Sequence, residues 1–411
     1  MNVTSTIIDD PRRPVSLVLA KDEVLVKPAA ADAAVDYSQL PPLYPEWLGD
    51  RAFAATHGAR FNYVVGEMAR GIATPQMVVA AVRAGCVGFY GSAGLQPAVI
   101  EDGIDEIQAQ LGLDRPAWGA NLIHTPQQPG YEAAVVDLFL RKGVHRVSAS
   151  AYMRLSPDIV RFTALGLERR DDGKIVRNHH VFAKVSRAEV AEQFMAPAPA
   201  KILHDLVADG SITTDQADLA SVVPVAAEIT AEADSGGHTD NRAAAPLFSS
   251  ISMARDRVAA RTGIDPDSIR IGLAGGIATP HGVAAAFQMG AAYVLTGSIN
   301  QSAVESGLSL PARLLLAKAG PADVAMAPAA DMFEQGVEVQ VLKRGTLFAM
   351  RAKKLHALYR AGASFETMDA KDRAWLEDML GEPFDKAWAE TRDYIRKANP
   401  REAEKAETDG N

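Results

Sequence analysis

The sequence predicts an α/β fold, namely a (β/α)₈ TIM barrel that carries a helical insertion and a C-terminal helical segment. Eight short, nearly continuous apolar runs alternate with helix-like segments, which is typical of parallel strands covered by helices on their outer face. In addition, the motif Gly-Ile-Ala-Thr-Pro occurs at residues 71–75 and again at 276–280. In both copies a further glycine follows fourteen residues after the first, so the two copies indicate equivalent βαβ units.

The apolar runs are the expected barrel strands, and each ends near a glycine or a small polar residue. They are residues 61–66, 85–91, 117–122, 144–150, 180–185, 228–234, 271–275 and 291–297. In each copy of the repeated motif a threonine precedes the proline. We therefore expect Thr74 and Thr279 to be helix N-caps, with proline at the first helical position.

The regions outside this alternation divide the chain further. We expect an irregular N-terminal segment (1–60), two barrel parts (61–185 and 224–318) separated by a helical insertion (186–223), a C-terminal helical segment (319–398) and a disordered tail (399–411). The insertion and the C-terminal helices are expected to form a smaller lid or substrate domain beside the barrel mouth.

Composition excludes several classes of function. The chain has 42 basic and 51 acidic residues, a net charge of −9, so it has no basic excess to neutralise the phosphates of a nucleic acid. The single cysteine, Cys86, excludes a disulfide framework and a cysteine-built metal site. Without a secretory signal or an apolar run of membrane-spanning length, we expect a cytoplasmic protein with no membrane partner. The oligomeric state, a homodimer included, stays open.

Glycine-rich turns follow the last two expected strands, at residues 274–276 and 296–298. Glycines allow backbone N–H groups to approach an anion, and the loops after strands seven and eight are the recurrent phosphate site of this barrel. Either turn by itself is more often only a tight turn, whereas the two together favour phosphate binding. The sequence has no G-x-G-x-x-G fingerprint and no P-loop, so the phosphate is expected to belong to a mononucleotide.

The sixth expected strand ends in a polar segment, residues 232–240, which contains acids, two glycines and His238. Histidine exchanges protons near neutral pH, and the place of His238 at the barrel mouth favours a catalytic role over a structural one. Metal ligation by Asp234, His238 and Asp240 is the weaker alternative, because no second histidine converges there. We therefore expect no metal.

Two further polar residues end buried strands. Lys184 ends the fifth, where an unpaired ammonium is expensive, so it either pairs with Asp234 or Glu232 or donates to an electron-rich cofactor ring. Asn121 ends the third and can both donate and accept hydrogen bonds at a cofactor edge. After the first strand, Met68 offers a soft apolar side chain beneath a flat ring.

These motifs together resemble PfaD-type enoyl reductases of polyunsaturated fatty acid and polyketide synthases. This family lies within a flavin-barrel group that includes nitronate monooxygenases and FabK-type enoyl-ACP reductases. The motifs similar to the group are G-E-M-A at 66–69, D-S-G-G-H at 234–238, A-G-G-I at 274–277 and T-G-S at 296–298. Segments 43–49, 89–95, 232–242 and 341–348 resemble the PfaD type in particular, and the resemblance extends from about residue 43 to 360.

The resemblance implies FMN as the cofactor, NADPH as the reductant and an enoyl thioester on an acyl carrier protein as the substrate. It implies FMN binding by Gly66, Glu67, Met68, Asn121, Lys184, Asp234, Gly236, Gly237, Ala274, Gly275, Gly276, Thr296, Gly297 and Ser298. His238 would be the catalytic residue, as proton donor or as a group that orients the carbonyl. Two alternatives stay open: a nitronate monooxygenase-like flavin oxygenase, and a non-catalytic assembly component of a synthase.

The stretch 343–360 has six lysine or arginine residues and no acid, in contrast to the acidic chain as a whole. Acyl carrier proteins are generally acidic, so this stretch predicts a docking face formed by Lys343, Arg344, Arg351 and Lys354. A solvated helix face, or pairing with acids elsewhere, explains the pattern equally well.

Overall fold

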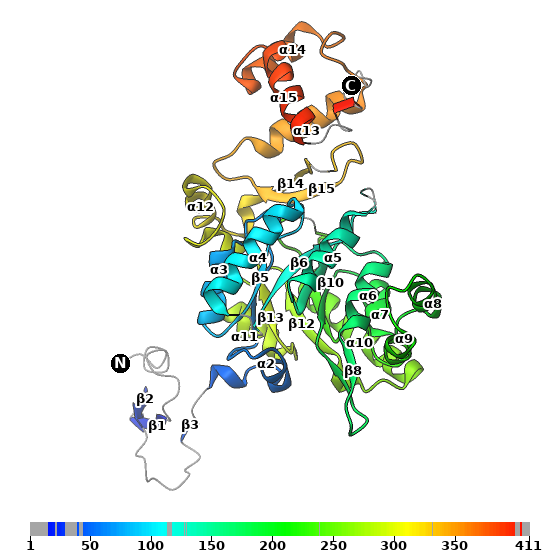
Figure 1. The fold of residues 1–411 in the computed structure, drawn as a ribbon. Helices are drawn as coiled ribbons and strands as arrows, with labels where there is room; N and C mark the ends of the chain where they lie inside the picture. Colours follow the sequence, from blue (N-terminus) through cyan, green and yellow to red (C-terminus); the bar gives the residue numbers. More distant parts are fainter. Residues whose placement is uncertain are drawn as a thin grey trace. The chain divides into compact units, whose positions relative to one another are not determined.

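The computed structural model describes residues 15–20, 23–28, 39–40, 44–112, 117–126, 128, 130–237, 239–330, 332–398 and 403–404. The chain divides into two compact units, Met1–Lys318 and Ala319–Asn411. The first contains the barrel, and the second contains a pair of strands with helices (Figure 1).

Eight parallel strands close into a barrel in the first unit, so the predicted fold class is confirmed (Figure 1). Around the barrel the strands follow chain order, and the last pairs with the first. They are β4 (Tyr63–Val65), β5 (Val87–Tyr90), β6 (Trp118–Ile123), β7 (Arg146–Ser150), β10 (His180–Val185), β11 (Glu228–Glu232), β12 (Arg270–Ala274) and β13 (Val294–Thr296). Every predicted apolar run overlaps one of these strands, because a strand buried on both faces has to be apolar along most of its length.

Helices connect the strands and cover the outer face of the barrel. They include α3 (Pro75–Arg83), α4 (Pro97–Leu111), α5 (Tyr131–Arg141), α6 (Pro157–Leu165), α10 (Ala244–Thr262) and α11 (Pro280–Gln288). Both expected N-caps are confirmed. The Oγ1 of Thr74 accepts the N–H of Met77 at 3.1 Å, and the Oγ1 of Thr279 accepts the N–H of Gly282 at 3.1 Å.

Between β10 and β11, where we expected the helical insertion, the chain forms α7 (Ala188–Met195), α8 (Ala200–Ala208) and α9 (Thr214–Ala220). A capping box starts α9, because Thr213 and Gln216 satisfy each other's backbone N–H groups. The α7 helix packs against α10, whereas α8 and α9 pack against α6. The insertion thus contacts the outer helical layer of the barrel.

Several antiparallel strands were not predicted by the alternation. In the segment expected to be irregular, β1 (Val15–Ala20) pairs with β2 (Glu23–Pro28) and β3 (Gln39–Leu40), and α2 (Arg51–His57) precedes the barrel. A hairpin of β8 (Leu167–Arg169) and β9 (Ile175–Arg177) precedes β10. β3, β8 and β9 have only two or three residues, and β2 mixes polar with apolar residues, so these four lack a continuous apolar run. β1 has one polar residue in six and was missed because it lies outside the strand–helix alternation.

The second unit contains helices, as expected, and in addition a pair of strands that was not predicted. Here β14 (Val324–Pro328) pairs antiparallel with β15 (Glu338–Leu342), and α13 (Phe348–Arg360) packs on β14. They are followed by α14 (Ala370–Leu380) and α15 (Phe384–Ala398). The expected disordered tail lies outside the described residues except for 403–404. No helix in the described ranges is long and apolar enough to cross a membrane.

Alternation along the strands separates the inside of the barrel from its outside. Phe53 of α2 enters the inner apolar cluster and stacks on Tyr293, with ring centroids 4.5 Å apart, and Phe89 meets Phe182 edge-on at 5.0 Å. Because side chains alternate in direction along a strand, residues 180 and 184 face inward together with Phe182. The inner apolar layer therefore lies between two polar ends, a base at residue 180 and a mouth at residue 184.

Candidate active site

The expected cofactor residues lie at the carboxyl ends of the barrel strands, the end that carries active sites in this fold. Gly66, Glu67 and Met68 follow β4; Asn121 and Lys184 lie in β6 and β10; Asp234, Gly236 and Gly237 follow β11; Ala274, Gly275 and Gly276 end or follow β12; Thr296, Gly297 and Ser298 end or follow β13. We call this end the mouth.

The glycine turns at the mouth lie next to one another. A Cβ atom added to Gly236 would lie 2.8 Å from the Oγ of Ser298, and one added to Gly275 would lie 2.4 Å from the carbonyl oxygen of Ala233. Larger residues would therefore disturb the contact between the turns after β11, β12 and β13. The backbone N–H groups of Gly276, Gly297 and Ser298 donate to no acceptor in the part of the chain that the structure describes.

The turn after β4 lies beside these glycine turns, and we call the four turns together the cradle. Gly66 donates its N–H to the carbonyl of Thr296 at 2.7 Å, and a Cβ atom on Gly297 would lie 3.7 Å from the Sδ of Met68. Met68 is buried, so its thioether forms an apolar wall beside the turn after β13. Available N–H groups, close glycine backbones and an adjacent apolar wall fit a phosphate-bearing group with a flat ring.

Lys184 is held by two carboxylates at the mouth. Its Nζ lies 2.8 Å from the Oε1 of Glu67 and 2.9 Å from the Oε1 of Glu232. Burial by itself lowers the pKa of Lys184, but the charges of Glu232 and Glu67 outweigh it and raise the pKa above the ordinary value. Of the two carboxylate partners proposed from the sequence, Glu232 is confirmed. Glu67 takes the place of Asp234.

Asn121 is buried, and its amide nitrogen is engaged within the protein. Its Nδ2 donates to the carbonyl of Ser148 and to the Oγ of Ser150, both at 2.9 Å. Because both N–H bonds are used by β7, only the Oδ1 atom is left to contact a ligand. We predicted that this side chain both donates and accepts hydrogen bonds at a cofactor edge; in the structure only the accepting oxygen is available for that role.

Two other predicted residues support the mouth through protein contacts. Thr296 donates its hydroxyl to the phenol oxygen of Tyr63 at 2.8 Å, so this side chain fixes the turn. The loop after β11 is anchored by Asp240, whose Oδ2 accepts from Ser186 at 2.6 Å and from Arg187 at 3.0 Å. Those hydrogen bonds hold the pKa of Asp240 below its usual range. The expected catalytic residue, His238, lies outside the described residues.

A second histidine at the mouth was missed by the sequence analysis. His124 directly follows β6, and its Nδ1 lies 2.9 Å from the Oε2 of Glu132, a buried carboxylate of α5. Tyr152 donates to the other oxygen of Glu132 at 2.7 Å, and Ser156 does so as well. The carboxylate thus orients His124 at the rim of the mouth. Its signal in the sequence was a histidine just beyond a strand that had already been predicted.

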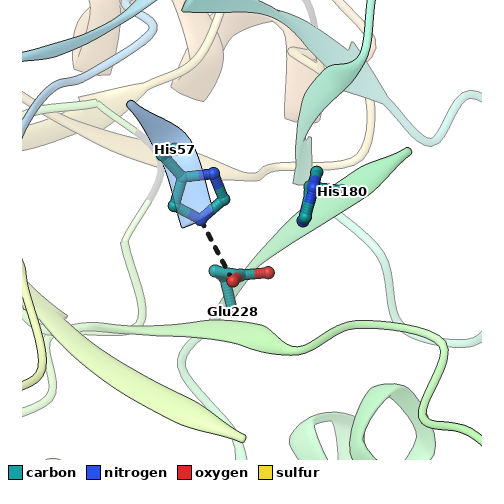
Figure 2. Close-up of side chains that lie close together, drawn as sticks. All are labelled: His57, His180 and Glu228. Carbon is teal, nitrogen blue, oxygen red and sulfur yellow. Dashed lines mark hydrogen bonds and ion pairs between the residues drawn. The ribbon is translucent and has the colours of Figure 1, made fainter. Parts of the chain in front are cut away.

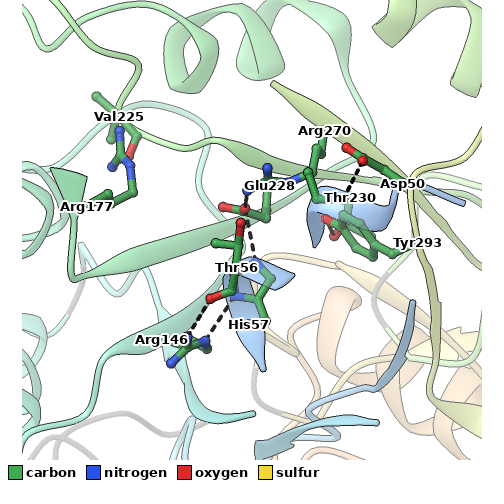
Figure 3. A network of polar contacts seen from close by, with 11 residues as sticks. Asp50, Thr56, His57, Arg146, Arg177, Val225, Glu228, Thr230, Arg270 and Tyr293 are labelled. Carbon is green, nitrogen blue, oxygen red and sulfur yellow. Dashed lines mark hydrogen bonds and ion pairs between the residues drawn. The ribbon is translucent and has the colours of Figure 1, made fainter. Parts of the chain in front are cut away.

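A separate polar cluster occupies the base, the opposite end of the barrel. His57 of α2, His180 of β10 and Glu228 of β11 lie together there (Figure 2). The Nε of Arg146 lies 3.0 Å from the Nδ1 of His57, so this nitrogen must accept (Figure 3). The Nε2 of His57 then carries the hydrogen and donates to Glu228 at 3.1 Å, which makes His57 neutral. In agreement with this, the pKa of His57 is lowered, and burial is the main cause.

Arg270 completes the base by forming a short ion pair with Glu228 (Figure 3). The three residues His57, His180 and Glu228 have ligand atoms within 4.8 Å of one another, as in a metal site. The guanidinium groups bonded to His57 and to Glu228 oppose a second cation at this place. This cluster was not predicted, because His180 and Glu228 are the first residues of two expected strands, 180–185 and 228–234, and gave no separate signal.

The expected docking residues lie in the second unit. Arg344 pairs with Asp323 at 3.2 Å, and Lys354 pairs with Asp372 at 2.8 Å and lies over the Trp375 ring. These two side chains therefore pair with acids, as the alternative expected, and docking stays a prediction. Lys343 is exposed, and Arg351 is half-buried without an ion pair in the described ranges.

The fold and the site define a class: a parallel (β/α)₈ barrel whose mouth fits a phosphate-bearing cofactor. The chain is 34% identical to the enoyl reductase domain of MlnA from the macrolactin biosynthesis cluster of Bacillus amyloliquefaciens, with a TM-score of 0.82 over 89% of this chain and 81% of that one. The chain belongs to this family, the PfaD-type enoyl reductases, as its motifs predicted. FabK from Thermotoga maritima, at 20% identity and a TM-score of 0.52 over 75% of this chain and 77% of that one, shares the fold.

Two longer proteins are also similar. The chain is 43% identical over 366 residues to a polyunsaturated fatty acid synthase polypeptide of Thraustochytrium sp., covering 88% of this chain and 24% of that polypeptide. It is 42% identical over 333 residues to the polyketide biosynthesis protein PksE of Bacillus subtilis, covering 81% of this chain and 43% of that protein. The chain thus spans less than half the length of these relatives. Residues 363–411 match the family model of the inserted helical domain of acyl-carrier-protein S-malonyltransferase.

Proposed function

We propose that the chain is an FMN-dependent enoyl reductase that uses NADPH to reduce the α,β double bond of an enoyl thioester on an acyl carrier protein. The reaction would serve polyunsaturated fatty acid or polyketide synthesis. The observation that carries the proposal is the cradle at the mouth, where the turns after β4, β11, β12 and β13 meet with unengaged N–H groups. Lys184, held by two carboxylates, lies at the same end of the barrel. Membership in the enoyl reductase family supports the choice of reaction.

In this proposal the phosphate of FMN is held by the N–H groups of Gly276, Gly297 and Ser298, and Met68 packs against its ring. When bound, FMN supplies hydride transfer from NADPH to the β-carbon of the thioester. Lys184 contributes a fixed positive charge, because Glu67 and Glu232 keep it protonated. A fixed cation stabilises the negative charge of a reduced cofactor, or of an enolate, in a site shielded from water.

The α-carbon must also receive a proton. His238 is our first candidate for the donor, on the strength of the D-S-G-G-H motif. His124 is the second, because Glu132 orients it at the rim of the mouth. A carboxylate that accepts from the Nδ1 of a histidine fixes the orientation of the ring and leaves Nε2 as the nitrogen that can exchange a proton.

The central experiment follows the flavin through both half-reactions. The purified protein should show a flavin spectrum, be reduced anaerobically by NADPH, and be reoxidised by an enoyl thioester without oxygen. Reoxidation only by an alkyl nitronate with oxygen would favour a flavin oxygenase instead, and a protein that binds no flavin would contradict the proposal. His238→Asn and His124→Asn should be compared in the oxidative half-reaction, where we expect the donor's variant to be slower by about 100-fold with flavin still bound.

Carrier docking is proposed on the basic and apolar surface at the start of α13. Leu347, Phe348 and Met350 are 53%, 47% and 63% exposed, and exposed apolar groups next to cations suit an acidic partner with an apolar rim. Since Lys354 is engaged with Asp372, the sharper test is Arg351→Glu with Lys353→Glu. We expect the KM for a carrier-bound substrate to rise about tenfold and that for a pantetheine thioester to stay unchanged.

The matched control for this docking test reverses the charges of Lys174 and Lys201, which are 80% and 85% exposed in the first unit. It makes the same change in net charge away from α13. If the control raised the KM of the carrier substrate equally, the effect would come from net charge and the docking surface would be wrong.

A further inference from the structure

We propose that the base of the barrel contains a second ligand site, one that binds a phosphate-type oxyanion independently of the mouth. The site is a cavity of about 390 Å³ between α2, the β8–β9 hairpin and the first residues of β10 and β12. It is lined by Thr56, Arg170, Val176, Arg177, Asn178, His180, Ala227 and Arg270. The mouth and this cavity lie at opposite ends of the same strands.

The lining carries three guanidinium groups and no carboxylate. Arg177 has only carbonyl partners in the described ranges, the oxygens of Val225 and Pro224. Arg170 is exposed and has no ion pair among the described residues. Arg270 is partly neutralised by Glu228, with which it forms an ion pair, and more weakly by Asp50. The cavity therefore has an excess of positive charge, and guanidinium groups bind phosphate oxygens in a bidentate manner.

Buried polar atoms facing this cavity are independent evidence for a ligand. His180 is 6% exposed, and its Nδ1 forms no hydrogen bond with the described part of the protein. The same is true of the Nε of Arg270. A buried polar atom without a partner is costly, and such atoms in native proteins are uncommon. An oxyanion accepts from Arg270, and it either accepts from the Nδ1–H of His180 or, when it carries a proton, donates to that nitrogen.

A cation is the competing occupant, because His57, His180 and Glu228 have the side chains of a metal site. Two observations favour the anion. The Nδ1 of His57 already accepts from Arg146, and its Nε2 donates to Glu228, so neither nitrogen has a lone pair for a metal. A divalent ion would also lie near the guanidinium groups of Arg146 and Arg270, whereas an anion is attracted to them.

The size of the cavity leaves two sources for the phosphate, the free ion or the phosphoryl group of a small metabolite. Both have the same oxygens for the arginines to bind. Inorganic phosphate and AMP therefore serve as the two probes. Binding of AMP at least tenfold tighter than phosphate would indicate a metabolite, and equal affinities would indicate recognition of the phosphate group alone.

The experiment uses the full chain with its cofactor. The melting temperature and the heat of binding are measured during titration with phosphate or AMP, with chloride as the ionic-strength control. We expect saturable stabilisation of the wild type and at least tenfold weaker binding by Arg170→Glu, whose exposed side chain makes misfolding unlikely to confound the result. Arg169→Glu is the matched control, because this exposed neighbour has the same charge and does not line the cavity.

Three outcomes would overturn the proposal. These are no saturable binding, equal weakening by Arg170→Glu and Arg169→Glu, and stabilisation by Zn²⁺ but not by phosphate. Flavin content is recorded in every sample as an independent readout of the mouth. A failure at the base is thereby distinguished from a failure of the proposed reductase, because either site can be lost while the other is retained.

Discussion

The mouth and the base of the barrel are built from the same two strands, with opposite charge arrangements. Inward positions of β10 hold His180 at the base and Lys184 at the mouth, and those of β11 hold Glu228 and Glu232. At the mouth one ammonium is shared by two carboxylates. At the base one carboxylate is shared by His57 and Arg270. Period-two alternation produces both ends, because it brings every second side chain to the interior.

Exposure separates the roles of the two clusters. Glu228 is fully buried, whereas Lys184 and Glu232 keep 15% and 25% of their side chains exposed. A fully buried pair is unable to exchange a partner for water or ligand without a large penalty. A partly exposed ion pair is able to exchange a partner in this way when a cofactor binds. The comparison predicts that the fully buried Glu228 contributes mainly to stability, whereas the partly exposed pair of Lys184 and Glu232 can rearrange when a ligand binds.

The largest effect is expected at the base, from Glu228→Gln. This change leaves Arg270 buried without its counter-ion, and breaking a buried pair from one side typically costs about 3–5 kcal/mol. Urea unfolding at neutral pH measures the loss, and the protein that stays folded should keep its flavin. Glu232→Gln at the mouth is the matched control with the smaller expected loss. Equal losses for the two variants would remove the distinction between the ends.

An intermediate effect is expected at the mouth, from Lys184→Met. Glu67, whose side chain is 1% exposed, then loses its cation. We expect flavin affinity to fall about 100-fold, which corresponds to about 2.7 kcal/mol. Fluorescence titration of the apoprotein with FMN measures it. Lys184→Arg keeps the charge and should restore most of the affinity. Normal flavin binding by the methionine variant would show that this cation has no part in the cofactor site.

The smallest effect is a pH dependence that comes from the base. Burial lowers the pKa of His180 to about 2; the charge of Glu228 opposes this shift, and His57 and the nearby arginines add to it. Below about pH 6.5 the unfolded chain therefore binds a proton that the folded chain does not, so stability is complete above that pH and falls on acidification by about 1.4 kcal/mol per pH unit. His180→Phe should flatten the slope of the unfolding free energy between pH 6 and 5, and replacement of the exposed His204 should not. An unchanged slope would contradict this assignment.

Much of the barrel could be predicted, because its signals are local. Buried parallel strands have to be apolar, so each expected run overlaps a strand of the closed barrel. The caps formed by Thr74 and Thr279 could be predicted because each hydroxyl accepts from an N–H group only three residues further on, and the proline is the next residue. The glycine turns after β12 and β13 were also correctly located, since a close backbone approach requires glycine wherever it occurs.

Contacts between residues far apart in the sequence were harder to predict. The pairing of Lys184 with Glu67 rather than Asp234 joins β10 to the turn after β4, more than a hundred residues apart. His124 and Glu132 are close in sequence, but their importance depends on burial of the carboxylate by Tyr152. The strands β14 and β15 were missed for different reasons: β15 alternates polar and apolar residues, whereas β14 is apolar but lies beyond the strand–helix alternation that identified the others.

By itself the sequence determined the fold class, the order of the strands and the position of the glycine turns at the mouth, because periodicity and turn chemistry are properties of neighbouring residues. Only the tertiary structure decided which acids hold Lys184, and only it brought His57 of α2 to Glu228 and three arginines to one cavity. The physical reason is that charge pairing and burial depend on distances through space, and barrel closure sets those distances.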